Sequence, residues 1–396
     1  MSVEKNRSMP NGSSPVGHSP RVLIIAGEAS GDLHGAFLVR EMLSMNSRLR
    51  FFGIGGNNMK AAGVELLAHA ADIAVVGISE VFSKVFTFWK IISRLRKSMD
   101  ALHPDLVILI DFPDFNLNIV ARAAKKRNLK IFYYISPQVW AWRAGRVEQI
   151  KKLVDQMAVI LPFEVDFYKA RGFMVHYVGH PLRDTVKTEF TTIQARRYFG
   201  LAEEKTTIGL LPGSRTSEIT KLLPEMISAA KIISRKIPDA QYILPLADTL
   251  EETSVIGILT DSGLNVKIVP GRTYDVLACC DLAIVASGTA TLETGLMGVP
   301  MIIIYKVSFF SELIGRLIIR PQHIGMVNII ADKTVAPELI QRDASGPRIA
   351  SEALNILQND ERRRNMIKDL NEIRAKLGNP GAAKRAAQLA CQMIRE

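Results

Sequence analysis

Cysteine is scarce in this sequence, and no apolar run reaches the roughly 20 residues that a membrane-spanning helix needs. Of the three cysteines, Cys279 and Cys280 are adjacent, and Cys391 stands alone near the carboxyl end. This number and spacing exclude a disulfide framework and a thiolate metal site, so we expect the cysteines to be small core residues. The first 19 residues are polar and lack the apolar centre of a signal peptide, and we expect them to be disordered and cytoplasmic.

A complete dinucleotide fingerprint is also missing. Gly53-Ile54-Gly55-Gly56 looks like part of one, but the third glycine is not at the required offset. No clear acidic residue follows on a later strand to hold a ribose. These absences argue against an oxidoreductase that depends on NAD(P).

The sequence does contain enough apolar residues for sizeable cores, and it has an excess of positive charge. Hydrophobic residues make up 48% of the 396 positions, and this length suits two domains of ordinary size. The formal net charge is +11. Such a balance favours anionic partners, which include phosphates, acidic lipid headgroups and nucleic acid, and the charge alone does not choose among them.

The segment Thr206–Ile219, TTIGLLPGSRTSEI, predicts a buried strand, a glycine turn and the first turn of a helix. Gly213 and Ser214 belong to the turn, and unpaired N–H groups at the start of such a helix bind anions. Arg215 adds a planar set of donors that matches two phosphate oxygens. The alternative is an ordinary strand-to-helix turn with a solvated arginine, and this segment alone leaves both interpretations open.

A second segment of the same kind follows the predicted strand Leu282–Val285. Its turn brings Ser287, Gly288 and Thr289 to the start of another helix. Glu293 lies about one helical turn further on, where a carboxylate can accept hydrogen bonds from ribose hydroxyls, although an acid near a helix N-terminus needs no ligand. Two such turns in one parallel sheet open on the same edge, so together they predict a nucleotide-diphosphate site.

In the amino-terminal half, two buried strands end in polar turns. The strand Asp105–Ile110 is followed by Asp111, which is placed to take a proton from a substrate hydroxyl. Asp114 is expected to cap the next helix. The strand Arg21–Ala26 runs into a glycine-containing turn in which Ser30 either caps the following helix or faces a ligand.

The segment Val75–Ile92 predicts a helix with apolar and aromatic residues along one side and basic residues on or beyond it. Such a helix suits a membrane interface, and it also suits packing against a sheet, so both roles stay open. The side chains expected to contact a membrane or acyl chains are Val81, Phe82, Val85, Phe86 and Trp89.

Strands alternate with helical patterns through both halves, which predicts the α/β class. We expect two doubly wound, Rossmann-like domains that face each other across a cleft, the second holding the nucleotide and the first the acceptor. The expected boundaries are a disordered extension at residues 1–20, a first domain at 21–200, a second domain at 201–375 and a terminal helix at 376–396.

A series of motifs along the chain resembles the lipid-A-disaccharide synthase family. The match runs from about Arg21 to the carboxyl end, and its order and spacing make it far more specific than any single motif. The motifs are AGEASGDLHG at Ala26–Gly35, IDFPDFN at Ile110–Asn116, SPQVWAWR at Ser136–Arg143, LLPGSR at Leu210–Arg215 and ASGTATLE at Ala286–Glu293.

The resemblance implies an inverting glycosyltransferase of the GT-B type that needs no metal or other cofactor, with a final helix that crosses back onto the first domain. It implies transfer of 2,3-diacylglucosamine from its UDP derivative to 2,3-diacylglucosamine 1-phosphate (lipid X), giving lipid A disaccharide 1-phosphate and UDP. Asp111 matches the general base for the acceptor's 6-hydroxyl, and Arg215 matches the residue that steadies the departing diphosphate. Glu293 would hold the ribose, and Ser30 and Asn328 match positions that line the cleft.

Because both sugars carry acyl chains, the resemblance also favours the membrane role of Val75–Ile92. It implies a peripheral location on the cytoplasmic, inner face of the inner membrane. It implies no nucleic-acid partner and leaves a homodimer open. The alternatives are a UDP-sugar 2-epimerase of the same architecture, a dinucleotide-dependent oxidoreductase and a membrane-bound nucleotide sensor without catalysis.

Overall fold

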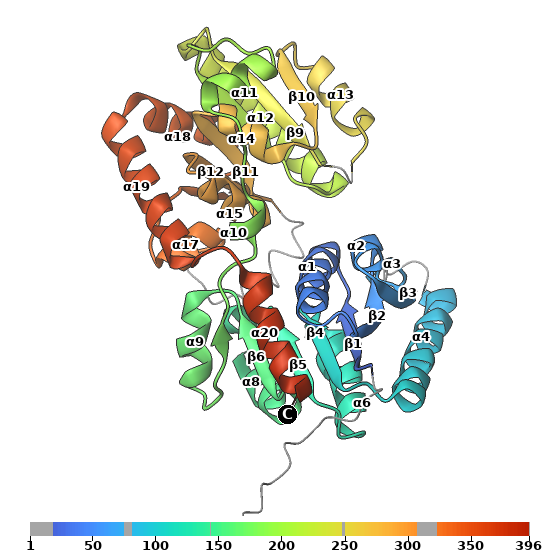
Figure 1. The fold of residues 1–396 in the computed structure, drawn as a ribbon. Coiled ribbons are helices and arrows are strands. Elements are labelled where there is room, and N and C mark those ends of the chain that lie inside the picture. Colours follow the sequence, from blue (N-terminus) through green and yellow to red (C-terminus); the bar gives the residue numbers. More distant parts are fainter. Residues whose placement is uncertain (1–18, 75–80, 143, 248–249, 307–322, 396) are drawn as a thin grey trace, which may run out of the picture. The chain divides into compact units, whose positions relative to one another are not determined.

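The computed structural model describes residues 19–74, 81–142, 144–247, 250–306 and 323–395. Contacts within the chain separate it into two compact units, and its strands form two parallel sheets (Figure 1). The first unit comprises Met1–Pro137, Gln149–Ala158 and Ala383–Glu396. The second unit comprises Gln138–Glu148 and Val159–Ala382. The chain therefore leaves the first unit and returns to it with its last helix.

Seven strands form the first sheet in the order β3-β2-β1-β4-β5-β6-β7, and every pair whose register is defined runs parallel. The central strands β1 and β4 consist mostly of buried valine, isoleucine and leucine, which is typical of strands covered on both faces. The strands are β1 (Arg21–Ala26), β2 (Arg50–Gly55), β3 (Val64–His69), β4 (Leu106–Ile110), β5 (Ile131–Tyr134), β6 (Gln156–Val159) and β7 (His176–Tyr177).

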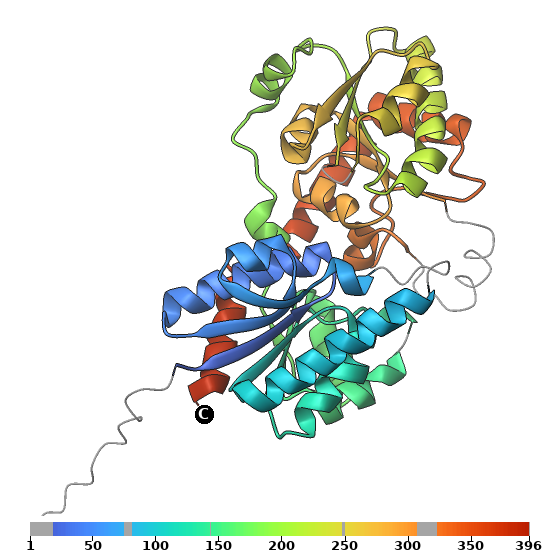
Figure 2. The same cartoon turned by 90° about the vertical axis from the view of Figure 1, so that its right-hand side faces the viewer.

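Helices cover both faces of this sheet, and α1 (Ala29–Met45) and α4 (Val81–Leu102) lie on opposite sides of it (Figure 2). The last helix, α20 (Ala382–Arg395), is held in the first unit by a 2.9 Å hydrogen bond from Lys130 to the carbonyl of Met393. The other helices of this part are α2 (Asn57–Ala61), α3 (Ala71–Ala74), α5 (Pro113–Phe115), a π-helical segment at Asn116–Ala121, α6 (Arg122–Lys125) and α8 (Val147–Leu153).

Six strands form the second sheet in the order β10-β9-β8-β11-β12-β13, again with parallel pairing. The order of strands reverses at β8 and β11, as it does at β1 and β4 in the first sheet, and this reversal defines a doubly wound fold. The predicted α/β class with two such sheets is confirmed. The strands are β8 (Thr207–Leu211), β9 (Gln241–Leu246), β10 (Val266–Pro270), β11 (Leu282–Ala286), β12 (Met301–Tyr305) and β13 (Glu338–Ile340).

The second unit also carries most of the remaining helices. No helix in the described part of the chain has the length and hydrophobicity that crossing a bilayer requires. The helices are α7 (Val139–Trp142), a 3₁₀ turn at Ala144–Arg146, α9 (Pro162–Lys169), α10 (Leu182–Thr185), α11 (Thr192–Tyr198), α12 (Thr216–Lys236), α13 (Thr253–Thr260), α14 (Thr273–Cys279), α15 (Thr289–Leu296), α17 (Met326–Ala331), α18 (Gly346–Gln358) and α19 (Asp360–Lys376).

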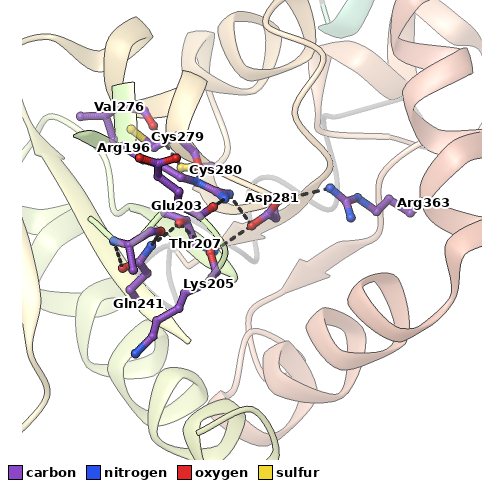
Figure 3. Close-up of polar contacts among 11 residues, drawn as sticks. Arg196, Glu203, Lys205, Thr207, Gln241, Val276, Cys279, Cys280, Asp281 and Arg363 are labelled. Carbon is purple, nitrogen blue, oxygen red and sulfur yellow. Dashed lines mark hydrogen bonds and ion pairs between the residues drawn. The ribbon is translucent and has the colours of Figure 1, made fainter. Parts of the chain in front are cut away.

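A buried ion pair between Arg196 and Asp281 ties α11 to the second sheet (Figure 3). The Arg196 guanidinium donates to the Asp281 carboxylate at 2.7 Å and to the carbonyl of Cys279 at 3.0 Å. The same carboxylate accepts hydrogen bonds from the N–H of Thr207 at 2.8 Å and from Arg363 at 3.3 Å. One carboxylate thus links α11, the start of β8 and α19, and Arg196 is its closest cationic partner.

Replacement of Arg196 with Ala is expected to lower the free energy of unfolding by about 3–5 kcal/mol, because the largely buried carboxylate of Asp281 loses its closest cationic partner. Chemical denaturation followed by circular dichroism measures this loss. Arg197 provides the matched control, since its side chain is 69% exposed and pairs with Glu203 at the surface. Arg197→Ala should be far less destabilising. Equal losses for the two variants would contradict the role of the buried pair.

Candidate active site

β8 and β11 are neighbours in the second sheet, so the turns that follow them open at the same edge. A pocket of about 310 Å³ lies there. The residues predicted from sequence that it brings together are Gly213, Ser214, Arg215, Ser287, Gly288, Thr289 and Glu293. Its further lining comes from Leu211, Glu218, Pro245, Ala247, Thr273, Ala286 and Ala290.

The carboxylate of Glu218 already occupies part of the α12 N-terminus. One of its oxygens accepts hydrogen bonds from the N–H groups of Ser214 at 2.9 Å and Arg215 at 3.3 Å, and the other lies 3.3 Å from the Arg215 guanidinium. Gly213, with a φ of 110°, permits this arrangement, because a Cβ atom there would collide with the carboxylate. The sequence predicted unpaired amides at this turn, but an acid near the helix start satisfies them internally. The Arg215 side chain remains 79% exposed.

The N-terminus of α15 is built differently. Gly288 precedes this helix and offers no side chain to cap it. Thr291 donates its hydroxyl to the carbonyl of Gly288 at 2.8 Å, and Ser287 donates its hydroxyl to the carbonyl of Ile324 at 3.3 Å. Within the described residues the first amides of α15 therefore have no capping side chain, and they present the positive end of the helix dipole to the pocket.

The carboxylate of Glu293 accepts a 2.8 Å hydrogen bond from the hydroxyl of Tyr274. Burial raises the pKa of Glu293 above its usual range, and the bond from Tyr274 acts in the opposite direction. Burial and the nearby carboxylate raise the pKa of Tyr274 as well, so this phenol stays protonated and donates. Tyr274 was not predicted from the sequence. Its place just after β10, in a third turn at the same edge of the sheet, was the available signal.

Asn328 is fully buried on α17 and does not line this pocket. Its side-chain N–H groups donate to the carbonyl of Ala336 at 2.8 Å and to the carboxylate of Glu338 at 2.7 Å. Its oxygen accepts from the N–H groups of Ala336 and the preceding residue. Glu338 also accepts from the N–H of Gly325 at 2.9 Å. Among the described residues, Asn328 is therefore linked to the pocket indirectly. Its partner Glu338 bonds the N–H of Gly325, and the carbonyl of the preceding residue, Ile324, accepts the hydroxyl of Ser287.

In the first unit, Asp111 directly follows β4. Burial raises the pKa of Asp111 to about 6, with a further contribution from the nearby negative charge of Glu28, while a hydrogen bond from the N–H of Phe112 acts in the opposite direction. Asp111 is ionised at neutral pH, yet it binds a proton far more readily than an exposed aspartate does. Asp114 is exposed. Among the described residues, no group of three or more His, Cys, Asp or Glu side chains is arranged to hold a metal ion.

Ser30 lies exposed in the first turn of α1, where a ligand can reach its side chain. Asp32 is buried and caps α2, the next helix along the chain, because its carboxylate accepts hydrogen bonds from the N–H groups of Gly56 at 2.6 Å, Asn58 at 3.0 Å and Met59 at 3.0 Å. A Cβ atom at Gly56 would collide with this carboxylate. The main-chain amides at and just after the end of the segment resembling a dinucleotide fingerprint are thus already hydrogen-bonded to Asp32.

A sequence model of the family described as lipid-A-disaccharide synthetase matches residues 22–393. The chain belongs to this family. The lipid-A-disaccharide synthase of Syntrophus aciditrophicus is 54% identical over 380 residues, which cover 96% of this chain and 99% of that relative. The resemblance predicted from the motifs is therefore confirmed, and with it the assignment as a glycosyltransferase.

Many solved structures share the fold of this synthase-family chain, and two of them serve as examples. The glycotransferase of kitacinnamycin aligns with a TM-score of 0.62 at 15% identity, covering 96% of this chain and 100% of that one. A UDP-GlcNAc 2-epimerase from Neisseria meningitidis bound to UDP-GlcNAc aligns with a TM-score of 0.59 at 12% identity, covering 95% and 99%. Identities this low show a common fold alone. Neighbours of this kind have the GT-B fold, as the sequence predicted for this chain.

Helix α4 carries the residues predicted to contact acyl chains or a membrane. In the described part of this helix, Ile92 and Leu95 are buried, whereas the side chain of Trp89 is 59% exposed. Trp89 is therefore free to meet an apolar partner. The structure does not describe the side chains of the other predicted residues, which are Val81, Phe82, Val85 and Phe86.

Replacement of Glu218 with Ala is expected to lower the free energy of unfolding by about 0.5–2 kcal/mol, because the first turn of α12 loses the carboxylate that bonds its amides. Urea denaturation of the full chain measures the change. Glu218→Gln is the control, since it removes the charge but keeps an acceptor oxygen, and most of the stability should remain. If both variants lost the same stability, the hydrogen-bond explanation would be wrong.

Proposed function

We propose that the protein condenses UDP-2,3-diacylglucosamine with 2,3-diacylglucosamine 1-phosphate to give lipid A disaccharide 1-phosphate and UDP, with inversion at the transferred sugar carbon. Membership of the lipid-A-disaccharide synthetase family across residues 22–393 is the observation that carries this proposal. The pocket at the edge of the second sheet and the partly buried Asp111 supply chemistry that suits the two halves of the reaction.

The pocket between the turns after β8 and β11 is the proposed site of the UDP group. Its diphosphate would bind the N-terminal amides of α15, since Glu218 already bonds two amides of α12. The exposed Arg215 would approach the diphosphate from the other side. Negative charge grows on the diphosphate as its bond to the sugar breaks, so Arg215 and the α15 dipole would stabilise the transition state more than the ground state.

Glu293 is proposed to hold the ribose. One of its oxygens accepts a hydrogen bond from Tyr274, which fixes the orientation of the carboxylate. The other oxygen would accept from the ribose hydroxyls. Ser30 is proposed to contact substrate through its exposed hydroxyl, whereas the buried Asn328 would act through Glu338 and the segment beside Ser287.

Asp111 is proposed to be the general base of the transfer. The acceptor's 6-hydroxyl oxygen would attack the donor sugar carbon as that carbon's bond to the diphosphate breaks, and the hydroxyl proton would pass to Asp111. A carboxylate with a pKa of about 6 is a stronger base than an ordinary aspartate, and it remains ionised at neutral pH. The acyl chains are proposed to meet Trp89 and the start of α4, with the protein held peripherally on the cytoplasmic face of the inner membrane.

Asp111→Asn is expected to lower kcat about 100-fold or more, because the amide cannot accept the proton, while UDP binding is kept. Mass spectrometry of the disaccharide formed from the two substrates measures the first quantity, and calorimetric titration with UDP measures the second. Asp114→Asn, at an exposed position in the same turn, is the matched control and should retain activity. Full activity in Asp111→Asn would remove Asp111 from the mechanism.

The same variant carries a check on folding. A carboxyl group whose pKa is raised in the folded state contributes stability below its unfolded pKa and loses that contribution as the pH rises through about 6. Above pH 6 the ionised Asp111 therefore destabilises the fold, and Asp111→Asn should have a Tm at pH 8 no lower than that of the wild type. A much lower Tm would mean that the variant loses activity through misfolding.

The rate should also depend on pH in a direction that the pKa of Asp111 sets. Only the ionised carboxylate accepts a proton, so kcat should fall as the pH drops through about 6 and level off above it. Glu28→Gln removes the neighbouring negative charge and should move this acid limb to lower pH. Initial rates between pH 4.5 and 8.5 in both proteins test this. An acid limb that stays in place in Glu28→Gln would contradict the assignment to Asp111.

A further inference from the structure

The backbone at Asp111 is held in a conformation that it would not keep unaided. Asp111 has a φ of 40° and Phe112 a φ of 47°, which places two consecutive non-glycine residues in the left-handed region. Single residues of this kind persist only where the surroundings over-determine them. The proposed base therefore stands on a turn that other groups of the first unit must hold.

Two buried side chains hold the main-chain carbonyl of Asp111. The hydroxyl of Tyr133 donates to it at 2.5 Å, and the side-chain amide of Asn116 donates to it at 2.7 Å. The same amide group donates to the carbonyl of Ile110 at 3.2 Å, so it spans the last residue of β4 and the first residue of the turn. Both Tyr133 and Asn116 are fully buried. One oxygen thus receives two donors from different elements, β5 and the π-helical segment.

The ring of Phe112, the next residue of the turn, is held by contacts of its own. It lies so close to Gly27, at the end of β1, that a Cβ atom there would collide with the ring. On its other side it contacts the ring of Phe115, with the ring centroids 5.7 Å apart. Rotation of the turn would pull the ring from this slot and break both hydrogen bonds to the Asp111 carbonyl.

Among the described residues, the side chain of Asn116 leaves one of its hydrogen-bonding atoms unpaired, which stability alone would not favour. Its amide N–H groups are used on two main-chain carbonyls, while its oxygen, in the described part of the chain, is buried without a hydrogen-bond partner. A buried acceptor left unpaired is destabilising.

We propose that Tyr133 and Asn116 are positioning residues of the transfer reaction, because together they hold the Asp111 carbonyl and so fix the direction of its carboxylate. This inference rests on the proposed role of Asp111 as the general base. Misplacing a reacting group by about 1 Å can lower a rate about 100-fold, so a modest relaxation of this turn has a measurable effect.

The test compares Tyr133→Phe with Tyr134→Phe. Successive strand residues point to opposite faces of the sheet, so the second variant removes the same group from a neighbouring buried position on the opposite face. Tyr133→Phe is expected to lower kcat about tenfold with the KM of both substrates unchanged. Tyr134→Phe is expected to keep the wild-type kcat. Equal kcat values for the two variants would overturn the proposal.

The pH profile separates positioning from a merely structural effect. The charged side chain that acts on Asp111 in the described structure is Glu28, and the N–H of Phe112 bonds the carboxylate. If the turn relaxes in Tyr133→Phe, the carboxyl gains water and the acid limb of kcat moves to lower pH. A lower kcat with an unmoved acid limb would mean that Tyr133 acts on overall folding and would overturn its positioning role.

A double-mutant cycle with Asp111→Asn completes the test. If Tyr133 acts through Asp111, Tyr133→Phe should not lower the residual rate of Asp111→Asn any further. An unchanged tenfold loss in that background would overturn the proposal. Retention of full activity by Asp111→Asn alone would instead overturn the proposed base role of Asp111, and a wild-type protein that forms no disaccharide would overturn the proposed function, so these failures are distinguishable. Asn116→Ala, with its Tm measured alongside, should lower kcat in the same way.

Discussion

A parallel sheet brings the carboxyl ends of its strands to one edge, and the groups proposed to act on the diphosphate, the ribose and the acceptor hydroxyl depend on that constraint. In the second sheet, β8 leads to Arg215, β10 leads to Tyr274 and β11 leads to the helix that carries Glu293. In the first sheet, β4 leads to Asp111. Strand pairing in the second sheet brings residues that are far apart in the sequence to the same edge, as it does for Tyr274 and Glu293.

The two helix N-termini at the edge of the second sheet illustrate how such a site can be both stable and ready for a ligand. α12 is closed by its own Glu218, which satisfies two amides and neutralises part of the helix dipole. α15 has no equivalent acid in its first turn. A diphosphate would be repelled by Glu218 but attracted by α15. Arg215 pairs with Glu218 but can also bind a phosphate. Its exposed ion pair with Glu218 is weak enough for a phosphate to compete for the guanidinium.

The sequence predicted the elements better than the contacts between them. The strand predicted at Arg21–Ala26 is β1 with the same bounds, because an apolar run closed by a glycine turn leaves little choice. The helix predicted within Val75–Ile92 is described from Val81 and continues to Leu102, since its apolar spacing persists beyond the aromatic residues. Glycine turns after β8 and β11 likewise predicted where a ligand pocket would form.

Side-chain partners across elements could not be predicted in this way. Asp32 lies in the first turn of α1 but caps α2, and only the folded approach of Gly56 makes that possible. Asn328 matches a position that lines the cleft, yet its four hydrogen bonds turn it into the protein interior. Local patterns predict where an element begins, whereas the choice among distant amides and carboxylates depends on packing that a single sequence does not reveal.

The same dependence on packing explains how Asp111 can combine burial, a raised pKa and a left-handed backbone. In a free loop any one of these would relax, because the turn would rotate the carboxylate into water. Here the turn follows β4, which is paired on both sides, with β1 and β5, and whose residues are all buried. Relaxation would have to shift a central strand and its close-packed neighbours, which is a far larger loss than the local strain. The centre of the sheet therefore allows the chain to keep the carboxylate that we propose as the general base half-buried, with a pKa of about 6.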